Sequence, residues 1–427
     1  MHGNEFRSKN ISARAIERLL YTYQNATDIK ESDGKDDAFA TRFLTQLSYE
    51  QFPYQESMFE EVARSQACLI DGLDNVETHV IDHESLAEMF DGVPLGDAIN
   101  ATFFLQAGVR SNAGQFNPSW LDQRNMEDVL KEIPRPNIEK VVARLITTPE
   151  RFRSEYRANS SGKPNLERYD YNPLVSTPFV DMGDHVPVAP ALRLILRTIT
   201  PGGLYYPGVS RYGQNFASDL GLLFEHYIGR QLRLIDGAEV VPEIVFKERC
   251  GERRSVDWFV ILPTIVLLVE VKSTRLRRSA QAGEDVLASL DSSLNKAKIQ
   301  LQKTLGYLSE RHSAFRTIPT DRPILAMIVT AEPIYPAAAY FLDHNTSPLG
   351  DESLPETHLC VASARDIEGL VTHGADVEGV LLEQIKNSPA PFVGLQAIGR
   401  QPGTENAILS EAWEKLPLLR RVAIDSN

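Results

Sequence analysis

The sequence predicts an α/β protein in which a mixed β-sheet flanked by helices follows a mainly helical amino-terminal domain. Apolar residues recur at helical spacing through most of the first 160 residues. The segment Pro201–Gly208, PGGLYYPG, is rich in proline and glycine and is typical of a linker. Beyond it, one helix-like segment, three strand-like segments, another helix and another strand follow in an order that favours a mixed sheet.

The first 200 residues are expected to be mostly helical. Ser12 is placed to cap a first helix, whose apolar side chains are Ile16, Leu19, Leu20 and Tyr23. Further amphipathic segments are 39–47, Met58–Ile70, Leu95–Leu105 and Asn137–Ile146. Short apolar runs between Ser160 and Pro190 predict a small β element or an extended connector, and a helix is expected over Ala191–Ile199.

The second half has a readable order of elements. The expected segments are a helix at Gln214–Ile235, strands at Glu239–Lys247, Arg254–Leu262 and Thr264–Val271, a helix at Gly283–Leu308, a strand at Ile324–Thr330, a helix at Ala337–Leu342, a strand at His358–Val361 and a helix at Ala364–Val371. The third strand is apolar on both faces, which predicts a central position. The predicted domains are 1–200, 201–372 and a helical extension, 373–427.

Composition limits the classes of function. The chain has 427 residues, with 44 Lys and Arg against 58 Asp and Glu, so its formal net charge is −14. This excludes a basic protein that coats nucleic acid, but not a nucleic-acid partner, because binding depends on where cations cluster. Three scattered cysteines favour a reducing compartment. With no signal-like amino terminus and no apolar run of about 18–20 residues, we expect a cytoplasmic protein without a membrane partner.

Two of the expected strands place charged groups together. If SVDWFVIL and TIVLLVEVK form a hairpin centred between Pro263 and Thr264, then Asp257 lies opposite Glu270. Opposite residues share a face, and Lys272, two positions further, shares it too. Pro263 cannot adopt the positive φ of a type I′ or II′ turn, so a longer or bulged loop that separates the carboxylates stays open.

Such a group suits phosphate chemistry. A pair of carboxylates, with water and substrate phosphate, can bind a hard cation such as Mg²⁺. A lysine beside them can stabilise charge on a scissile phosphate.

These residues resemble the PD-(D/E)xK nuclease superfamily over about residues 210–371. The match is Asp257 followed by Glu270-Val271-Lys272, after a helix that offers Glu225 in a Gly-x-x-x-Glu setting beginning at Gly221. Members related to recombination exonucleases often have a glutamine on the next helix, where Gln300 stands, with Gln302 as the alternative. Val256 replaces the proline of the family name, a position that is loosely kept.

The resemblance implies a restriction-endonuclease-like core and a phosphodiesterase that depends on Mg²⁺ or Mn²⁺. Asp257 and Glu270 would bind the metal, Lys272 would be the catalytic cation, and Glu225 an accessory ligand or base. Gln300 would complete the catalytic set. A prokaryotic restriction or anti-phage defence effector is the setting that the resemblance favours.

Basic residues near the site offer phosphate contacts. Arg275, Arg277 and Arg278 directly follow the lysine, and Lys296 lies one turn before the glutamine; a solvated loop and helix face are the alternatives. Residues 211–310 carry 14 basic against 13 acidic residues, so the acidic excess lies elsewhere. The stretch 151–157 contains both basic and aromatic residues. It either grips a nucleic-acid backbone with stacking or is one exposed helix face.

Two histidines have the i, i+4 spacing of metal ligands on one helix turn. They are His79 and His83, and without a third ligand nearby a structural role is the favoured interpretation.

Three functional hypotheses follow. The first is a DNA nuclease with a helical recognition domain. The second is a nuclease-fold binding subunit whose activity requires, or is replaced by, a partner protein bound through the acidic amino-terminal domain. The third is RNA as the substrate.

Overall fold

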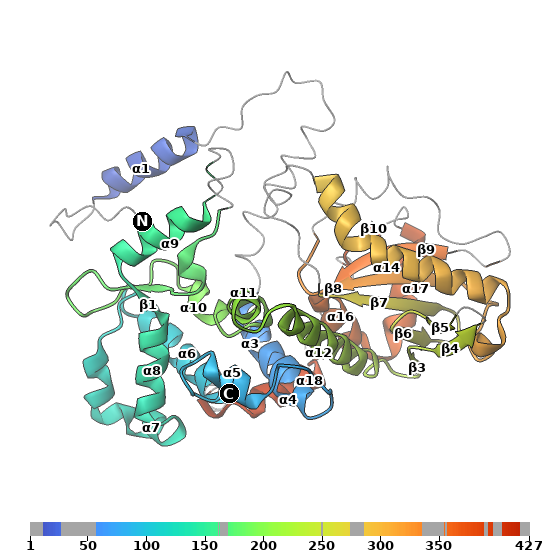
Figure 1. Cartoon of the computed structure of the whole chain (residues 1–427), viewed down its shortest axis with the longest axis horizontal. Helices are drawn as coiled ribbons and strands as arrows, with labels where there is room; N and C mark the ends of the chain where they lie inside the picture. The colour runs from blue at the N-terminus through green and yellow to red at the C-terminus, as the bar shows by residue number, and fades with distance from the viewer. Residues whose placement is uncertain are drawn as a thin grey trace.

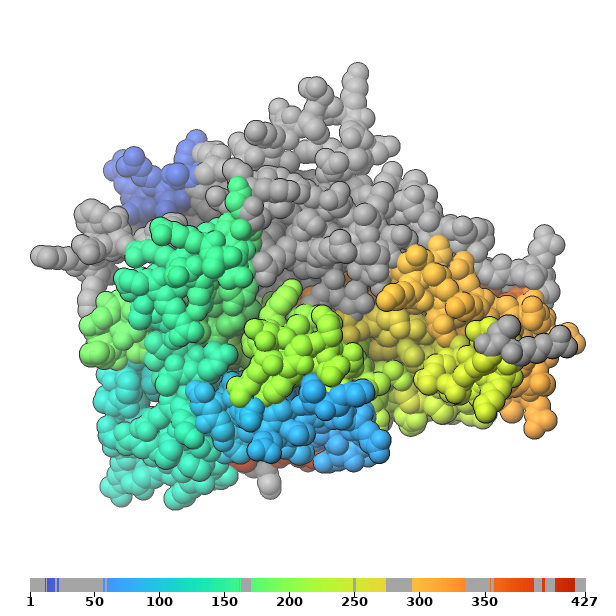
Figure 2. Space-filling view, in the orientation of Figure 1, coloured from blue at the N-terminus to red at the C-terminus, as the bar shows by residue number. Residues whose placement is uncertain are grey.

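The computed structural model describes residues 12–26, 57–160, 162, 170–248, 251–273, 286–334, 354, 357–387, 392–395 and 404–418. A helical part lies beside a part built on a β-sheet, and the long helix α12 lies between them (Figure 1). In the space-filling view the two parts are in contact along this boundary (Figure 2). The mixed α/β class predicted from the sequence is confirmed.

The amino-terminal part is helical, as predicted. Its elements are α1 (Ala13–Ala26), α3 (Met58–Ser65), η2 (Gln66–Ile70), α4 (Asp71–Leu73), α5 (His83–Glu88), α6 (Leu95–Arg110), η3 (Pro118–Asp122), η4 (Arg124–Met126), α7 (Glu127–Glu132), α8 (Arg135–Leu145), α9 (Pro149–Asn159), η6 (Pro173–Val175) and α10 (Arg193–Arg197). The Ser12 hydroxyl accepts the Ala15 N–H at 3.2 Å, so the expected cap is present. The small β element expected between Ser160 and Pro190 is β2 (Phe179–Val180), which pairs in parallel with β1 (Ile146–Thr147), a strand that was not expected.

The predicted linker at Pro201–Gly208 is wrong, because this segment is helix α11 (Pro201–Tyr212). Thr200 caps the helix by accepting the Gly203 N–H at 3.0 Å, and Pro201 occupies the first turn, where its missing N–H costs nothing. A Cβ on Gly203 would lie 1.9 Å from the Arg197 carbonyl oxygen, and one on Gly208 would lie 2.1 Å from the Phe216 ring. The glycines therefore serve close packing rather than chain flexibility.

The central sheet has six strands in the order β10-β9-β8-β7-β6-β3. The strands are β3 (Glu239–Pro242), β6 (Trp258–Ile261), β7 (Val266–Lys272), β8 (Ile324–Thr330), β9 (Thr357–Ser363) and β10 (Phe392–Val393). Strands β7 to β10 are mutually parallel, and β6 is antiparallel to both of its neighbours, β3 and β7. Strand β7 has the predicted central position.

Helices cover both faces of the sheet. Helix α14 (Val286–Ser309) packs on the face that includes Phe259, Leu268 and Ile328. The other face packs against α12 (Gln214–Leu232) and α16 (Ala364–Leu370). This second core is continuous with that of the amino-terminal helices, from Val62 to Leu418.

One predicted strand is divided, and the next begins later than predicted. Residues predicted as one strand at Glu239–Lys247 form β3 and β4 (Val245–Glu248). The next predicted strand, Arg254–Leu262, is β6, and only its first residue belongs to the preceding strand β5 (Gly251–Arg254). The β4–β5 pair is a separate two-stranded hairpin. The division occurs because side chains replace ladder hydrogen bonds: the Ile244 N–H binds the Ser255 hydroxyl, and the Val256 N–H binds the Thr304 hydroxyl.

A buried polar network holds α12 in place. Glu368 on α16 forms a paired salt bridge with Arg64 on α3, at 2.5 and 2.7 Å, and accepts the Tyr227 hydroxyl at 2.7 Å. Gln231 on α12 donates to the Tyr227 hydroxyl and accepts from Asn406. The network joins α12 to elements distant in the sequence.

The carboxyl-terminal segment returns to the body of the protein. It contains η8 (Val371–Asp376), α17 (Val377–Asn387), β10 and α18 (Ala407–Glu414), and α18 packs against α3 and η2. The predicted helices are present, but β10 has only two residues and no strand was expected there. The predicted helices at 39–47 and 337–342 lie outside the described residues. Among the described helices, none has the length and apolar character to cross a bilayer.

Candidate functional site

The β6–β7 hairpin has the predicted register. Pairs run from Trp258 with Val269 to Ile261 with Val266, so the next step places Asp257 opposite Glu270. The Leu262 N–H donates to the Ile265 carbonyl at 3.0 Å and closes a turn of two residues. Neither Pro263 nor Thr264 has positive φ, so the turn is not of type I′ or II′. No longer or bulged loop separates the carboxylates.

Direct contacts hold the three predicted side chains at this end of the sheet. Asp257 Oδ2 accepts the Val271 N–H at 2.7 Å, and Lys272 Nζ donates to Glu270 Oε1 at 2.5 Å. Glu270 is only 4% exposed. Its second oxygen, Oε2, is buried and has no hydrogen-bond partner among the described residues.

Helix α12 brings Glu225 close to this group. Burial, together with the charges of Asp257 and Glu243, raises the pKa of Glu225 to about 7, and Lys272 acts in the opposite direction. Gly221, one turn earlier, lies next to the end of β7, since a Cβ there would be at an ordinary contact distance, 3.5 Å, from the hydroxyl oxygen of Ser273. The expected convergence of Glu225 with the strand residues is therefore observed, while their catalytic roles stay predictions.

What we call the carboxylate cluster is formed by Glu225, Glu243, Asp257, Glu270 and Lys272. This cluster has an unfavourable excess of negative charge. Burial and the neighbouring Asp257 raise the pKa of Glu270 to about 8, and burial also raises the pKa of Asp257. Burial alone would lower the pKa of Lys272, but Glu270 and Asp257 raise it, so this side chain stays an ammonium. A bound cation would relieve the repulsion between the carboxylates.

One acidic residue of the cluster, Glu243, was not predicted from the sequence. The β3–β6 pairing runs from Glu239 with Ile261 to Pro242 with Trp258, and one further step places Glu243 opposite Asp257. Burial and Asp257 raise its pKa, although Arg254 forms an ion pair with it at 3.0 Å and opposes the rise. The antiparallel register of β3 with β6 could have identified Glu243 as a member of the cluster. It was missed because Glu239–Lys247 was predicted to be one unbroken strand.

The predicted site residues of α14, Gln300 and Lys296, do not contact the carboxylates of the cluster in the way that the sequence implied. Gln300 Nε2 donates to the backbone carbonyls of Arg254 and Ser255, at 2.5 and 2.7 Å. It therefore fixes the segment that leads into Asp257, and its amide binds backbone rather than a carboxylate. Lys296 is exposed one turn earlier on the helix. Arg275, Arg277 and Arg278 lie outside the described residues.

The aromatic residues of the stretch 151–157 belong to a small core. Phe152 is buried with Leu174 and Val180, and the Tyr156 ring packs parallel to it with centroids 6.3 Å apart. Arg151 pairs with Glu155 within the helix. Stacking of nucleic-acid bases on Phe152 is thereby excluded.

The two histidines do not lie on one helix turn. His79 precedes α5, and its Nδ1 lies 2.8 Å from Oδ1 of the buried Asp219 on α12. The same carboxylate accepts the N–H groups of His79, Val80 and Ile81 at 2.7–2.9 Å. These hydrogen bonds join the loop 79–81 to α12.

The donor set of the cluster suits a hard divalent cation. Within the described part of the chain, no group of three or more His, Cys, Asp and Glu side chains is placed to hold a metal ion as it stands. Mg²⁺, however, takes only one or two protein carboxylates and completes its shell with water and phosphate. The unpartnered Oε2 of Glu270 and the carboxylate of Asp257 across the hairpin fit that requirement.

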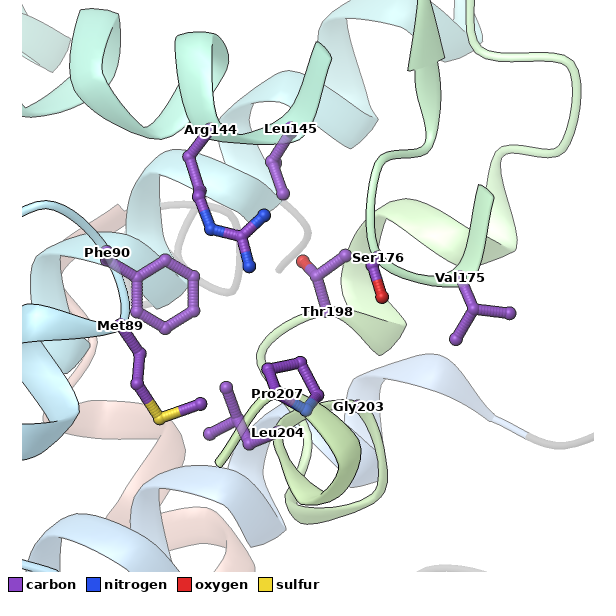
Figure 3. A pocket seen from close by; sticks show the side chains of 10 residues that line it. All are labelled: Met89, Phe90, Arg144, Leu145, Val175, Ser176, Thr198, Gly203, Leu204 and Pro207. Atoms are coloured by element: carbon purple, nitrogen blue, oxygen red, sulfur yellow. The ribbon is translucent and has the colours of Figure 1, made fainter. Parts of the chain in front are cut away.

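A separate pocket lies in the helical part (Figure 3). Its lining is mostly apolar and includes the side chains of Phe90, Leu204 and Pro207, with Arg144 directed into it. None of the predicted site residues lines it. This pocket is therefore distinct from the carboxylate cluster.

Comparison with protein-family models, curated proteins and solved structures finds no match. The chemistry assigned to the cluster therefore rests on the residues and geometry of this chain.

Proposed function

We propose that this protein is a metal-dependent nuclease that hydrolyses DNA phosphodiester bonds, with a restriction-endonuclease-like sheet as its catalytic core. The observation that carries the proposal is the convergence of Asp257, Glu270 and Lys272 at one end of the sheet, with Glu225 approaching from α12. Two carboxylates and an ammonium, half-buried or buried beside one another, suit the binding of a cation and an anionic phosphate together.

Each side chain has a role in this proposal. Asp257 and Glu270 would hold Mg²⁺ or Mn²⁺, with Glu225 as an accessory ligand or base. When bound, such a cation polarises the phosphate and lowers the pKa of a bound water. Lys272 is cationic at neutral pH and stabilises negative charge on the phosphate. The pKa of Glu225, about 7, is suited to moving a proton at physiological pH. Gln300 is a positioning residue here.

The test is cleavage of linear, circular and single-stranded DNA by the full chain, with and without Mg²⁺ or Mn²⁺. Lys272→Ala is expected to abolish cleavage. Lys303→Ala, which removes an exposed lysine of α14, serves as the matched control and is expected to retain it. Equal cleavage by wild type and Lys272→Ala would refute the proposed site. A matched RNA substrate in the same assay distinguishes a ribonuclease.

A second candidate function is a nuclease-fold subunit that requires a partner protein. Helix α1 favours it, since its side chains Ile16, Leu19 and Tyr21 are 47%, 69% and 69% exposed. Exposed apolar residues on one amphipathic helix are typical of a protein-binding segment. Absence of cleavage by the purified chain, with cleavage restored by a co-purifying protein, would support this alternative. A defence setting and a cytoplasmic location remain part of the proposal.

A further inference from the structure

The β4–β5 hairpin continues from the strands that carry the cluster. Its pairs are Val245 with Arg254 and Lys247 with Glu252, and these four side chains are exposed on one face. The opposite face is attached to the protein, because the centroid of the Phe246 ring lies 5.0 Å and 5.4 Å from the ring centroids of Tyr307 and Phe315. The first face is therefore the one open to a partner.

The base of this hairpin is fixed next to Asp257. The Ser255 N–H donates to the Ile244 carbonyl at 3.1 Å, and Gln300 binds the carbonyls of Arg254 and Ser255. Arg254 is only three residues before Asp257, and its guanidinium opposes the rise that burial causes in the pKa of both Glu225 and Glu243. This places a cationic side chain beside the cluster on a rigid backbone.

The present partners of Arg254 are replaceable. Its guanidinium pairs with Glu243 at 3.0 Å and with Glu252 at 3.2 Å, and its side chain is 61% exposed. Exposed ion pairs contribute little stability, whereas a planar guanidinium binds a phosphate with two parallel hydrogen bonds. The segment 247–254 also carries four basic residues against two acidic ones, in a chain of net charge −14.

We propose that Arg254 binds a backbone phosphate of duplex DNA next to the scissile phosphate, exchanging its pairing with Glu243 for that contact. The exposed face of the β4–β5 hairpin then lies along the DNA backbone. This inference rests on the proposed function, since it assumes that the cluster binds the scissile phosphate.

The test is equilibrium binding of a fluorescent DNA duplex to the full chain in Ca²⁺, with the probe checked to be intact, across a series of salt concentrations. Each phosphate contact contributes about 0.9 to the slope of log K against log salt. Arg254→Gln is expected to reduce the slope by about that amount and to weaken binding most at low salt. Arg253→Gln, on the attached face and paired with Glu248, is the control and should leave the slope unchanged.

A double-mutant cycle tests the exchange of partners. Glu243→Gln releases Arg254 and is expected to strengthen binding, and this gain should disappear in Glu243→Gln/Arg254→Gln. A wild-type slope in Arg254→Gln, or a gain that persists in the double variant, would overturn this inference and leave the nuclease proposal standing. No duplex binding by the wild type under any condition would overturn both. Unchanged thermal midpoints establish that the variants are folded.

Discussion

Replacing Glu270 by Gln should stabilise the metal-free protein at alkaline pH. The carboxyl is 4% exposed, one of its oxygens lacks a partner among the described residues, and its pKa is raised from 4.5 to about 8. At about 1.4 kcal/mol per pKa unit, the cost of keeping it ionised has an upper bound of about 5 kcal/mol. Relaxation and water penetration reduce such penalties, so we expect a gain of about 2 kcal/mol.

The sign of the pH dependence follows from the raised pKa. Between pH 4.5 and pH 8 the folded state holds a proton that the unfolded chain releases, so this carboxyl destabilises the fold progressively as pH rises. The difference between Glu270→Gln and wild type should therefore be small near pH 5 and complete above pH 8. Urea unfolding at both ends of this window, in a chelator, measures it.

A control variant and a second measurement with added Mg²⁺ complete this experiment. Glu239→Gln, at an exposed position on β3, should change stability little at either pH. Mg²⁺ should stabilise wild type, by about 2.7 kcal/mol at one hundred times its Kd, and should stabilise Glu270→Gln much less. If Glu270→Gln is no more stable than wild type at pH 9 without metal, the description of this site as a strained carboxylate cluster is refuted.

Three further predictions concern the surroundings of the site. Glu368→Gln should cost about 3–5 kcal/mol in urea unfolding, because it leaves the charge of Arg64 buried without its partner, and Arg64→Met in the same chain should recover part of the loss. Gly229→Ala would place a Cβ 2.2 Å from the Trp258 ring, and should lower both the thermal midpoint and DNA cleavage; Gly221→Ala, with 3.5 Å to its nearest neighbour, should do neither. Asp219→Asn should cost about 1–3 kcal/mol at pH 7. Burial raises the pKa of Asp219, but the hydrogen bonds that its carboxylate accepts from N–H groups lower it by more, so the pKa is lowered overall. The difference in stability between wild type and Asp219→Asn should therefore shrink as pH falls below about 4, as acid unfolding would show.

The site was predictable where local rules decide the structure. The Asp257–Glu270 register depends on strand periodicity, which can be read from the sequence, and on a turn of two residues, to which the sequence left a longer or bulged loop as the alternative. The apolar strand β8, Ile324–Thr330, has the predicted bounds, because a run buried on both faces has few alternatives.

Other features depended on contacts between distant segments. Gly203 and Gly208 resemble linker residues until Arg197 and Phe216 pack against them. Glu243 looks like part of a continuous strand, because the sequence does not reveal that Ser255 and Thr304 supply hydrogen bonds that divide it. Tertiary packing overrides local composition in each of these cases.

The network around Glu368 limits which parts of this chain can be exchanged, by recombination in evolution or by protein engineering. One apolar core runs from Val62 to Leu418, and Glu368 depends on Arg64, some 300 positions earlier in the chain. A fragment limited to the sheet, α12 and α16 would expose that core and leave Glu368 without its cation. The part of the chain that contains Asp257 and Glu270 is therefore not expected to fold without the amino-terminal helices. Recombination that exchanged the amino-terminal helices for another module would have to replace the support of α12 as well.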